Sequence, residues 1–328
     1  MPTVSVIIPT YKHRDFVMAT LDSVFAQTFT DYEVIVVNDG SPDDTAEVLR
    51  PLIEAGRIRY IEQANAGQAA ARNRGIAEAK SDLIALLDDD DLWPPDKLEW
   101  QQAALAGQPE AGMVAGSLVL VDADANPVET PPQILDVTYE TLFRQNPFIS
   151  PGQTLIRASV LKRIQGLNVE IRGADDWDLW FRIARTSTIL VKDRLALLYR
   201  VHAGNASRQG DVMLHNCCRV VEMHLENVAP EKRKALRATA YQTLYGYFGM
   251  KLLGQTKEAI RAGQWRRLPP YGAALLRLFI TVIAIHPKYA YRIFRDLLPS
   301  LVRGQFAAIK IGIRKRLDGA ARSKAART

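Results

Sequence analysis

The first ninety residues alternate short apolar runs with segments whose apolar positions have helical spacing. Short apolar runs predict buried strands, and the spaced segments predict helices. The predicted strands are residues 4–9, 33–38, 58–62 and 83–87, and the predicted helices are residues 16–27, a segment opened by residues 41–44, and residues 68–79. This alternation predicts an α/β fold with a Rossmann-like, mostly parallel central sheet, right-handed crossovers and helices on both faces.

Polar or aromatic residues follow each predicted strand: Thr10 and Tyr11, Asp39, Asn65 and an acidic block at residues 88–91. The carboxyl ends of parallel strands share one edge, where ligands bind, so we expect these side chains to converge. Four consecutive aspartates after a buried strand repel one another and lose hydration, which a bound divalent cation would relieve. The alternative is a solvated loop that caps the next helix.

A second acidic segment begins at Asp175 and Asp176, at the start of a predicted helix. A carboxylate near a helix N-terminus is favoured in its charged form, so it can accept a proton at neutral pH. Asp178 is spaced to pair with Arg182 at i, i+4. The apolar stripe of this helix is Trp177, Trp180, Phe181 and Ala184. We expect its tryptophans to be core residues rather than platforms for a sugar.

Several familiar features are absent from the sequence. No G-x-G-x-x-G follows the first strand and no G-x-x-x-x-G-K-[ST] occurs, which disfavours a dinucleotide dehydrogenase and a P-loop phosphotransferase. No secretory signal is evident at the N-terminus. The only cysteines, Cys217 and Cys218, are adjacent and give no disulfide framework. These features favour a cytoplasmic location.

Six segments in order resemble the inverting family 2 glycosyltransferases, which use nucleotide-diphosphate sugars and have the fold called GT-A. They are VSVIIPTYK, EVIVVNDGSPDDT, NAGQAAARNRG, ALLDDDDLWPPDKL, GADDWDLWFRIA and YRVHAGNAS. The resemblance covers about residues 4–207. It implies a GT-A domain, to which the sequence adds a C-terminal helical extension.

The resemblance implies a role for several residues in donor binding. The lip of a nucleotide base pocket would be Pro9, Thr10 and Tyr11. Asp39 matches a carboxylate that accepts a hydrogen bond from the base, and Arg72 matches a basic residue that closes the pocket. Without the resemblance, Tyr11 is equally well explained as core and Arg72 as a solvated helix residue.

The resemblance also implies a metal site. Asp88 and Asp90 match the D-x-D pair that holds Mn²⁺ or Mg²⁺, and Asp89 takes a ribose contact or shares in the pair. The register within the four aspartates is uncertain by one residue. His202 matches a residue near the diphosphate and is a weaker candidate metal ligand, with a hydrogen-bonded loop histidine as the open alternative.

Asp176 matches the family's general base, and Asp175 stands where glutamate is common. The implied reaction is a metal-assisted single displacement, in which a cation neutralises the leaving diphosphate and a carboxylate deprotonates the acceptor hydroxyl. The expected enzyme is a hexosyltransferase, with a UDP-sugar as the favoured donor and a saccharide or lipid-linked glycan as acceptor. A sugar nucleotidyltransferase and a non-catalytic module that binds glycans or lipid head groups are the alternatives.

The two ends of the chain differ in charge. Residues 230–328 hold 21 Lys and Arg against 4 Asp and Glu, whereas the rest holds 21 against 32. We therefore predict a catalytic domain at residues 1–228 and a basic, amphipathic helical region at residues 229–328. Apolar stripes at residues 273–285 and 289–302 suit an anionic bilayer surface, so we expect peripheral attachment to the inner face of the plasma membrane. A helical cap on the catalytic domain is the alternative. No pattern typical of nucleic-acid binding accompanies the charge.

Overall fold

The structure is a computed structural model that describes residues 1–202, 204–205 and 210–263. The described chain divides into two compact units, Met1–Leu236 and a second that begins at Arg237. The predicted stripes at residues 273–285 and 289–302 lie outside the described residues. Whether residues 228 and 229 separate two domains stays a prediction.

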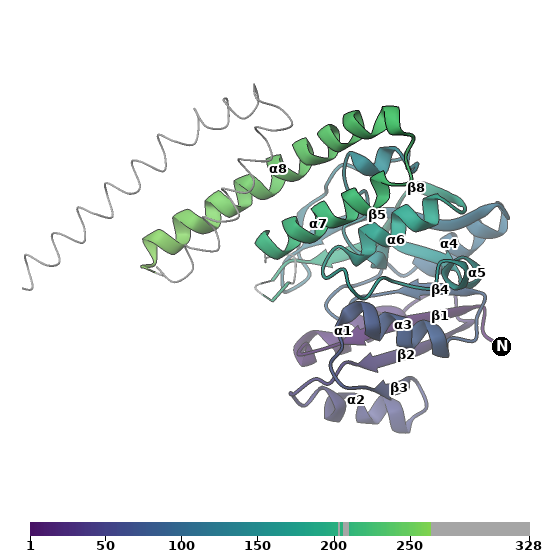
Figure 1. The fold of residues 1–328 in the computed structure, drawn as a ribbon. Helices are drawn as coiled ribbons and strands as arrows, with labels where there is room; N and C mark the ends of the chain where they lie inside the picture. Colours follow the sequence, from purple (N-terminus) through teal and green to yellow (C-terminus); the bar gives the residue numbers. More distant parts are fainter. Residues whose placement is uncertain (203, 206–209, 264–328) are drawn as a thin grey trace, which may run out of the picture. The chain divides into compact units, whose positions relative to one another are not determined.

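The first unit is built on one eight-stranded sheet with the order β3-β2-β1-β4-β7-β5-β6, and β8 pairs with β5 (Figure 1). The strands are β1 (Val4–Thr10), β2 (Tyr32–Asn38), β3 (Arg59–Glu62), β4 (Leu83–Leu86), β5 (Ala111–Val121), β6 (Pro127–Glu129), β7 (Thr154–Arg157) and β8 (Thr188–Arg200). The pairs among β1 to β4 are parallel, as is β5 with β8. The predicted mostly parallel α/β sheet is therefore confirmed, with β7 and β6 as antiparallel members.

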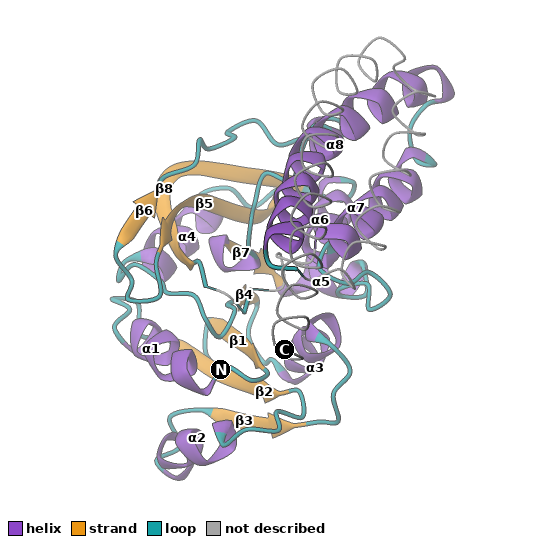
Figure 2. Ribbon diagram, turned by 90° about the vertical axis from the view of Figure 1, so that its left-hand side faces the viewer, coloured by secondary structure: helices purple, strands orange, loops and turns teal. Residues whose placement is uncertain are grey.

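Helices cover both faces of this sheet (Figure 2). The helices of the first unit are α1 (Arg14–Phe25), α2 (Thr45–Glu54), α3 (Gln68–Glu78), α4 (Lys97–Ala106), α5 (Ala158–Arg163), α6 (Asp175–Ala184) and α7 (Gly210–Leu225). A further helix, α8 (Pro230–Arg261), begins in the first unit and continues into the second. The 3₁₀ turns are η1 (Thr141–Phe143) and η2 (Pro151–Gln153). No helix in the described part of the chain combines the length and apolar character needed to cross a bilayer.

Alternation along the strands explains the two layers. Val4, Val6 and Ile8 of β1 join a buried cluster with apolar residues of α1, α2 and α4. Ile35 and Val37 of β2 point to the opposite face and pack with residues of α3. Successive side chains of a strand alternate between faces, so fully apolar strands require cover on both sides.

Gly75 lets α3 approach the sheet closely. A Cβ at this position would lie only 2.3 Å from Cγ2 of Ile7 in β1. This close packing fixes α3 against the strand whose carboxyl end carries Thr10 and Tyr11. The sequence therefore places α3 and its Arg72 directly beside the edge where the predicted site lies.

Candidate active site

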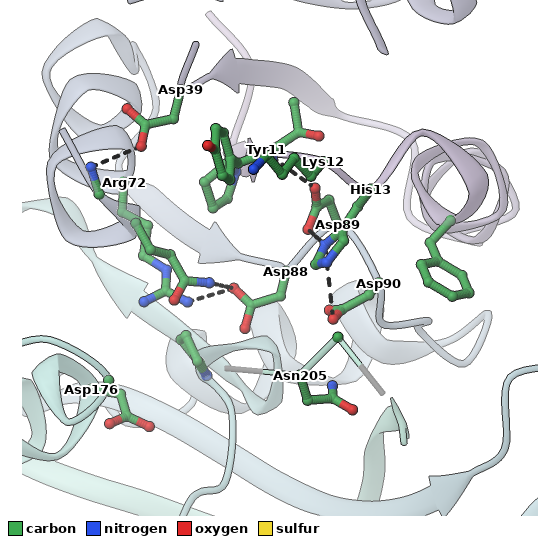
Figure 3. A pocket seen from close by; sticks show the side chains of 18 of the residues that line it. Tyr11, Lys12, His13, Asp39, Arg72, Asp88, Asp89, Asp90, Asp176 and Asn205 are labelled. Carbon is green, nitrogen blue, oxygen red and sulfur yellow. Dashed lines mark hydrogen bonds and ion pairs between the residues drawn. The ribbon is translucent and has the colours of Figure 1, made fainter. Parts of the chain in front are cut away.

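The polar residues that follow β1, β2 and β4 line one cavity of about 700 Å³ (Figure 3). All ten predicted site residues line it: Pro9, Thr10, Tyr11, Asp39, Arg72, Asp88, Asp89, Asp90, Asp176 and His202. β1, β2 and β4 run parallel, which brings their carboxyl ends together. The structure thus gathers residues that are as much as 193 positions apart in the sequence, from Pro9 to His202.

Asp39 lies at one end of this cavity in a nest of donors. Its Oδ1 accepts hydrogen bonds from Nε2 of Gln63 at 2.8 Å and the backbone nitrogen of Ala66 at 2.9 Å. Its Oδ2 accepts one from the backbone nitrogen of Gly67 at 2.8 Å. A carboxylate has about four acceptor positions, so one remains for a donor on a ligand.

Thr10 and Tyr11 form the neighbouring wall. The Thr10 hydroxyl oxygen is buried and has no hydrogen-bond partner among the described residues. The Tyr11 side chain is 38% exposed, and Nζ of Lys12 lies 4.9 Å from the centre of its ring. A partly exposed ring beside a carboxylate acceptor provides both a stacking surface and a polar contact for a planar base.

The four aspartates of the acidic block have different partners. Asp88 accepts hydrogen bonds from Nε2 of Gln68 at 2.9 Å and from the guanidinium of Arg72. Asp91 is fully buried and accepts from Oγ of Ser150 at 3.1 Å and the backbone nitrogen of Arg200 at 2.9 Å. Asp91 does not line the cavity, so residues 88–90 are the part of the block that faces a ligand.

Asp89 and Asp90 each contact a histidine. Oδ1 of Asp89 lies 2.7 Å from Nδ1 of His13, and Oδ2 of Asp90 lies 2.9 Å from Nε2 of His202. The backbone nitrogen of Tyr11 donates to the other oxygen of Asp89 at 3.2 Å. The loop after β1 and the loop after β8 are therefore both tied to the acidic block.

The block carries excess negative charge. Burial, together with the charges of Asp88 and Asp89, raises the pKa of Asp90 to about 6. Burial and the charge of Asp90 hold the pKa of Asp91 well above its usual range. The hydrogen bond to Asp89 raises the pKa of His13 to about 9, so a metal ion that bound this imidazole would displace a proton. A cation bound between such crowded carboxylates would stabilise their charged forms.

One ligand atom from each of His13, Asp90 and His202 lies within 4.8 Å of the other two. Two imidazole nitrogens and a carboxylate oxygen are a donor set that fits a divalent metal ion. Of the predicted metal ligands, Asp90 and His202 belong to this cluster, whereas Asp88 faces Arg72 instead. The role of Asp88 as a metal ligand stays a prediction.

Sequence reasoning missed His13. The strand predicted at residues 4–9 drew attention only to Thr10 and Tyr11, whereas β1 runs to Thr10 and His13 lies three residues beyond it. The signal was available, because a loop that leaves the carboxyl end of a parallel strand keeps several residues near the ligand edge.

Arg72 links the acidic block to the second acidic segment. It is 2% exposed, and its guanidinium bridges Asp88 and Asp175, with 2.8 Å between Nη1 and Oδ2 of Asp175. Burial alone would lower the pKa of Arg72, and the charges of the two carboxylates raise it. In the structure, this residue contacts carboxylates rather than projecting freely into the base pocket. Its predicted contact with a nucleotide stays untested.

Asp176 lies next to Asp175 in the first turn of α6 and faces the cavity. Its Oδ2 accepts a hydrogen bond from Nδ2 of Asn146 at 3.3 Å, and its Oδ1 accepts one from the backbone nitrogen of Trp177 at 2.6 Å. Burial and the charge of Asp175 raise the pKa of Asp176 to about 8. The expectation that the helix N-terminus favours the charged form is therefore wrong for Asp176, because burial and Asp175 outweigh the helix. Once ionised, a carboxylate with a raised pKa is a strong proton acceptor.

The remainder of α6 is structural. Trp177 and Trp180 are buried, which confirms that they are core residues. Nε of Arg182 lies 2.8 Å from Oδ2 of Asp178, which confirms the predicted i, i+4 pair. The other oxygen of Asp178 lies 2.9 Å from Nε2 of His224 in α7, a contact that the sequence did not predict. These buried contacts anchor the helix that carries Asp176.

Part of the sequence matches the model of a known protein family. Residues 5–165 match the model of the family described as glycosyl transferase family 2. An uncharacterized glycosyltransferase of Rickettsia felis is 29% identical over 216 residues, which are 63% of this chain and 36% of the relative. The chain therefore spans about a third of the length of that relative.

Two solved structures have the same fold. TarS from S. aureus, in complex with UDP-GlcNAc, aligns with a TM-score of 0.65 at 17% identity, covering 86% of this chain and 83% of that one. The mannosyltransferase PcManGT from Pyrobaculum calidifontis, in complex with GDP-Man and Mn²⁺, aligns with a TM-score of 0.57 at 21% identity, covering 94% and 87%. The predicted GT-A type of fold is confirmed by these alignments.

Proposed function

The chain belongs to glycosyl transferase family 2 through residues 5–165, and on that premise we propose that it transfers a sugar from a nucleotide-diphosphate sugar to an acceptor hydroxyl with inversion at the anomeric carbon. The observation that carries this proposal is the convergence of both acidic segments on one cavity at the strand ends. A nucleotide site alone would not require the second segment, and a glycan-binding module would not require Asp176 beside a cation site.

The residues divide the reaction between two parts of the cavity. Asp39, Thr10 and Tyr11 bind the nucleotide base, and Asp89 contacts the ribose. Asp90 and His202 would hold a divalent ion, which when bound would neutralise the charge of the leaving diphosphate. The UDP-GlcNAc and GDP-Man complexes of TarS and PcManGT support a nucleotide sugar as donor, and the Mn²⁺ of PcManGT supports a metal.

Asp176 acts as the general base. Its carboxylate removes the proton from the attacking hydroxyl while the diphosphate leaves from the opposite face of the sugar, and this single displacement inverts the anomeric carbon. Asn146 and the backbone nitrogen of Trp177 hold the two oxygens of the carboxylate in place. Asp175 pairs with Arg72 and orients the start of α6.

We further propose a UDP-hexose as donor and a saccharide or lipid-linked glycan of the cell envelope as acceptor. The basic region beyond residue 229 would hold the catalytic unit on the anionic inner face of the plasma membrane. Co-sedimentation with anionic and neutral vesicles at low and high salt tests this attachment. Equal recovery with both kinds of vesicle, or recovery that is insensitive to salt, would contradict it.

A donor screen tests the function. The full chain is incubated with Mn²⁺, a panel of UDP-, GDP- and dTDP-sugars and a membrane extract, and released nucleoside diphosphate is measured. We expect release from one class of donor that depends on the extract, with an inverted linkage by NMR. Synthesis of a nucleotide sugar from a nucleoside triphosphate and a sugar phosphate would indicate the nucleotidyltransferase instead. Donor binding without release in any extract would indicate a binding module.

A further inference from the structure

The geometry points to His13 as a third protein ligand of the metal ion, one that makes the site prefer Mn²⁺ and neighbouring transition-metal ions to Mg²⁺ and Ca²⁺. This inference rests on the proposed metal-assisted transfer and names the class of ion that the site takes. Asp90 and His202 alone would leave a site with one oxygen and one nitrogen. His13 adds a second imidazole to the same cluster.

The separations suit one ion. Nε2 of His202 lies 2.9 Å and Nδ1 of His13 lies 4.0 Å from the same oxygen, Oδ2 of Asp90. With bonds of about 2.1 Å, adjacent ligand atoms of an octahedral ion are about 3.0 Å apart and opposite ones about 4.2 Å. All three ligand atoms of the cluster lie within 4.8 Å of one another, which is slightly more than the separation of opposite ligands. His202 and Asp90 already have the separation of adjacent ligands, and the His13 ring would have to move inward to complete the set.

The loop that carries His13 is held in place. The His13 carbonyl accepts hydrogen bonds from the backbone nitrogens of Phe16 at 2.9 Å and Val17 at 3.0 Å, so the residue opens α1. Its ring meets the His202 ring edge-on at 5.5 Å, and the Phe16 ring lies 4.6 Å from that of His202. The side chain of His13 is 25% exposed and that of His202 is 9% exposed. An ion would therefore have an aromatic wall on one side and the cavity on the other.

The type of ligand decides the type of ion. Mg²⁺ and Ca²⁺ prefer sites made of oxygen atoms, and Mg²⁺ gives up its water reluctantly. Imidazole nitrogens favour first-row transition-metal ions, and two histidines with one carboxylate form a face that leaves the remaining positions open. In this site the open positions would face the cavity, where a diphosphate would bind. Aspartates alone would also accept Mg²⁺ or Ca²⁺. The His13 imidazole therefore shifts the preference of the site towards Mn²⁺ and neighbouring transition-metal ions.

The other explanation of His13 is that it serves only as a partner of Asp89. The 2.7 Å contact between them would then be the whole of its role. His13→Asn separates the two explanations, because an asparagine amide can still donate to Asp89 but is a poor ligand for a transition-metal ion. His202→Asn gives the result for loss of an imidazole ligand. His215→Asn is the matched control, since His215 is an exposed residue of α7 outside the cluster.

The experiment measures binding of Mn²⁺ and Mg²⁺ to the full chain by calorimetry, and the nitrogen couplings of bound Mn²⁺ by pulsed electron paramagnetic resonance. We expect the wild type to show couplings from two imidazoles and H13N to show one. H13N should also weaken Mn²⁺ binding by at least about tenfold, comparable with losses on altering the surroundings of metal ligands, with a smaller change for Mg²⁺. H215N should match the wild type.

Unchanged nitrogen couplings and an unchanged ratio of Mn²⁺ to Mg²⁺ affinity in H13N would overturn the inference and leave the proposed transfer intact. Absence of Mn²⁺ and Mg²⁺ binding by the wild type, with and without UDP or GDP, would instead remove the metal from the proposed function and the inference with it. Circular dichroism of each variant checks that the fold is retained.

Discussion

The molecule has two acidic segments that differ in what surrounds them. The acidic block of residues 88–91 follows β4 and meets two histidines as well as Arg72, whereas Asp175 and Asp176 open α6, where only Asp175 meets that arginine. In the block, each carboxylate has its own partner and the excess charge faces the cavity. In α6, the charge of Asp175 is compensated by Arg72, and Asp176 has only an asparagine and a backbone nitrogen.

This difference suggests how similar residues acquire different roles. Carboxylates beside imidazoles in a cavity form a set of metal ligands. A buried carboxyl group beside another carboxylate, with no cation of its own, has a raised pKa and becomes a base. Arg72 lies between the segments and links them, because it pairs with Asp88 on one side and Asp175 on the other. The predictions that follow test this division.

The largest effect is expected for Asp176→Asn. Asparagine has nearly the same shape but cannot accept the proton, so the rate of transfer should fall by about 10²–10⁴-fold. Nucleotide binding should be retained, because Asp176 belongs to the other acidic segment. Steady-state kinetics with the donor found in the screen, and calorimetry with the nucleoside diphosphate, measure the two quantities.

Asp175→Asn is the companion variant. It removes the ion pair with Arg72 but leaves the proposed base, so it should retain more activity than Asp176→Asn. If Asp176→Asn turned over nearly as fast as the wild type, or if Asp175→Asn lost more activity, the assignment of the base to Asp176 would be wrong.

Arg72→Met should destabilise the fold strongly. The substitution leaves Asp88 and Asp175, which are 17% and 5% exposed, without their shared cation. Removing one partner of a buried ion pair costs about 3–5 kcal/mol, because the other charge stays buried. Urea denaturation followed by circular dichroism measures the free energy of unfolding.

Arg74→Met is the control for that loss. Arg74 lies on the same helix, is 53% exposed and pairs with Glu78 at 3.0 Å. An exposed pair of this kind contributes about 0.3–0.5 kcal/mol. Equal losses for the two variants would mean that Arg72 does not act as a buried bridge between the segments.

Asp90→Asn should weaken Mn²⁺ binding by about 10–100-fold or more, since losses of that size already follow changes around metal ligands. Asp91→Asn is the neighbouring control. Asp91 faces Ser150 and the backbone of Arg200, and its pKa is raised by burial, so a neutral amide should be tolerated. A loss of Mn²⁺ binding in Asp91→Asn but not in Asp90→Asn would shift the metal ligand by one position.

Much of this arrangement follows from local sequence. The strands before Thr10, Asp39 and the acidic block are parallel, so the rule that ligands bind at their carboxyl ends predicted which side chains would meet. The start of α6 was likewise predicted from helical spacing. The family resemblance added the roles of these residues, which spacing alone does not give.

What the sequence could not predict depends on long-range contacts. β7 is only four residues long, and its insertion between β4 and β5 has no local signal. The ion pair of Arg72 with Asp175 joins positions 103 residues apart. The separation of the acidic block into Asp88 facing Arg72 and Asp90 facing His202 likewise depends on elements far along the chain.

The smallest effect concerns the pH dependence of transfer. As the proposed base, Asp176 is active as a carboxylate, so kcat/KM should rise with pH through the pKa of this group, which burial and Asp175 raise to about 8. Nδ2 of Asn146 donates to this carboxylate and stabilises its charged form, which lowers the pKa. A hydrogen bond to a charged group contributes about 1.5–3 kcal/mol, and the lower figure suits this long contact of 3.3 Å. A difference of about 1.36 kcal/mol corresponds to one pKa unit. Asn146→Ala should therefore move the rising limb to higher pH by up to about one unit.

The measurement is kcat/KM from about pH 6 to 10 for the wild type, Asn146→Ala and the control Asn126→Ala. Asn126 lies in an exposed turn and bonds Asp122, so its loss should leave the profile unchanged. A shift to lower pH in Asn146→Ala would mean that the contact stabilises the protonated form of Asp176. A profile that falls across this range would mean that Asp176 donates a proton rather than accepting one. The base would then have to come from outside the described α6. Asp175 is the other carboxylate of this helix that lines the cavity, and it is paired with Arg72.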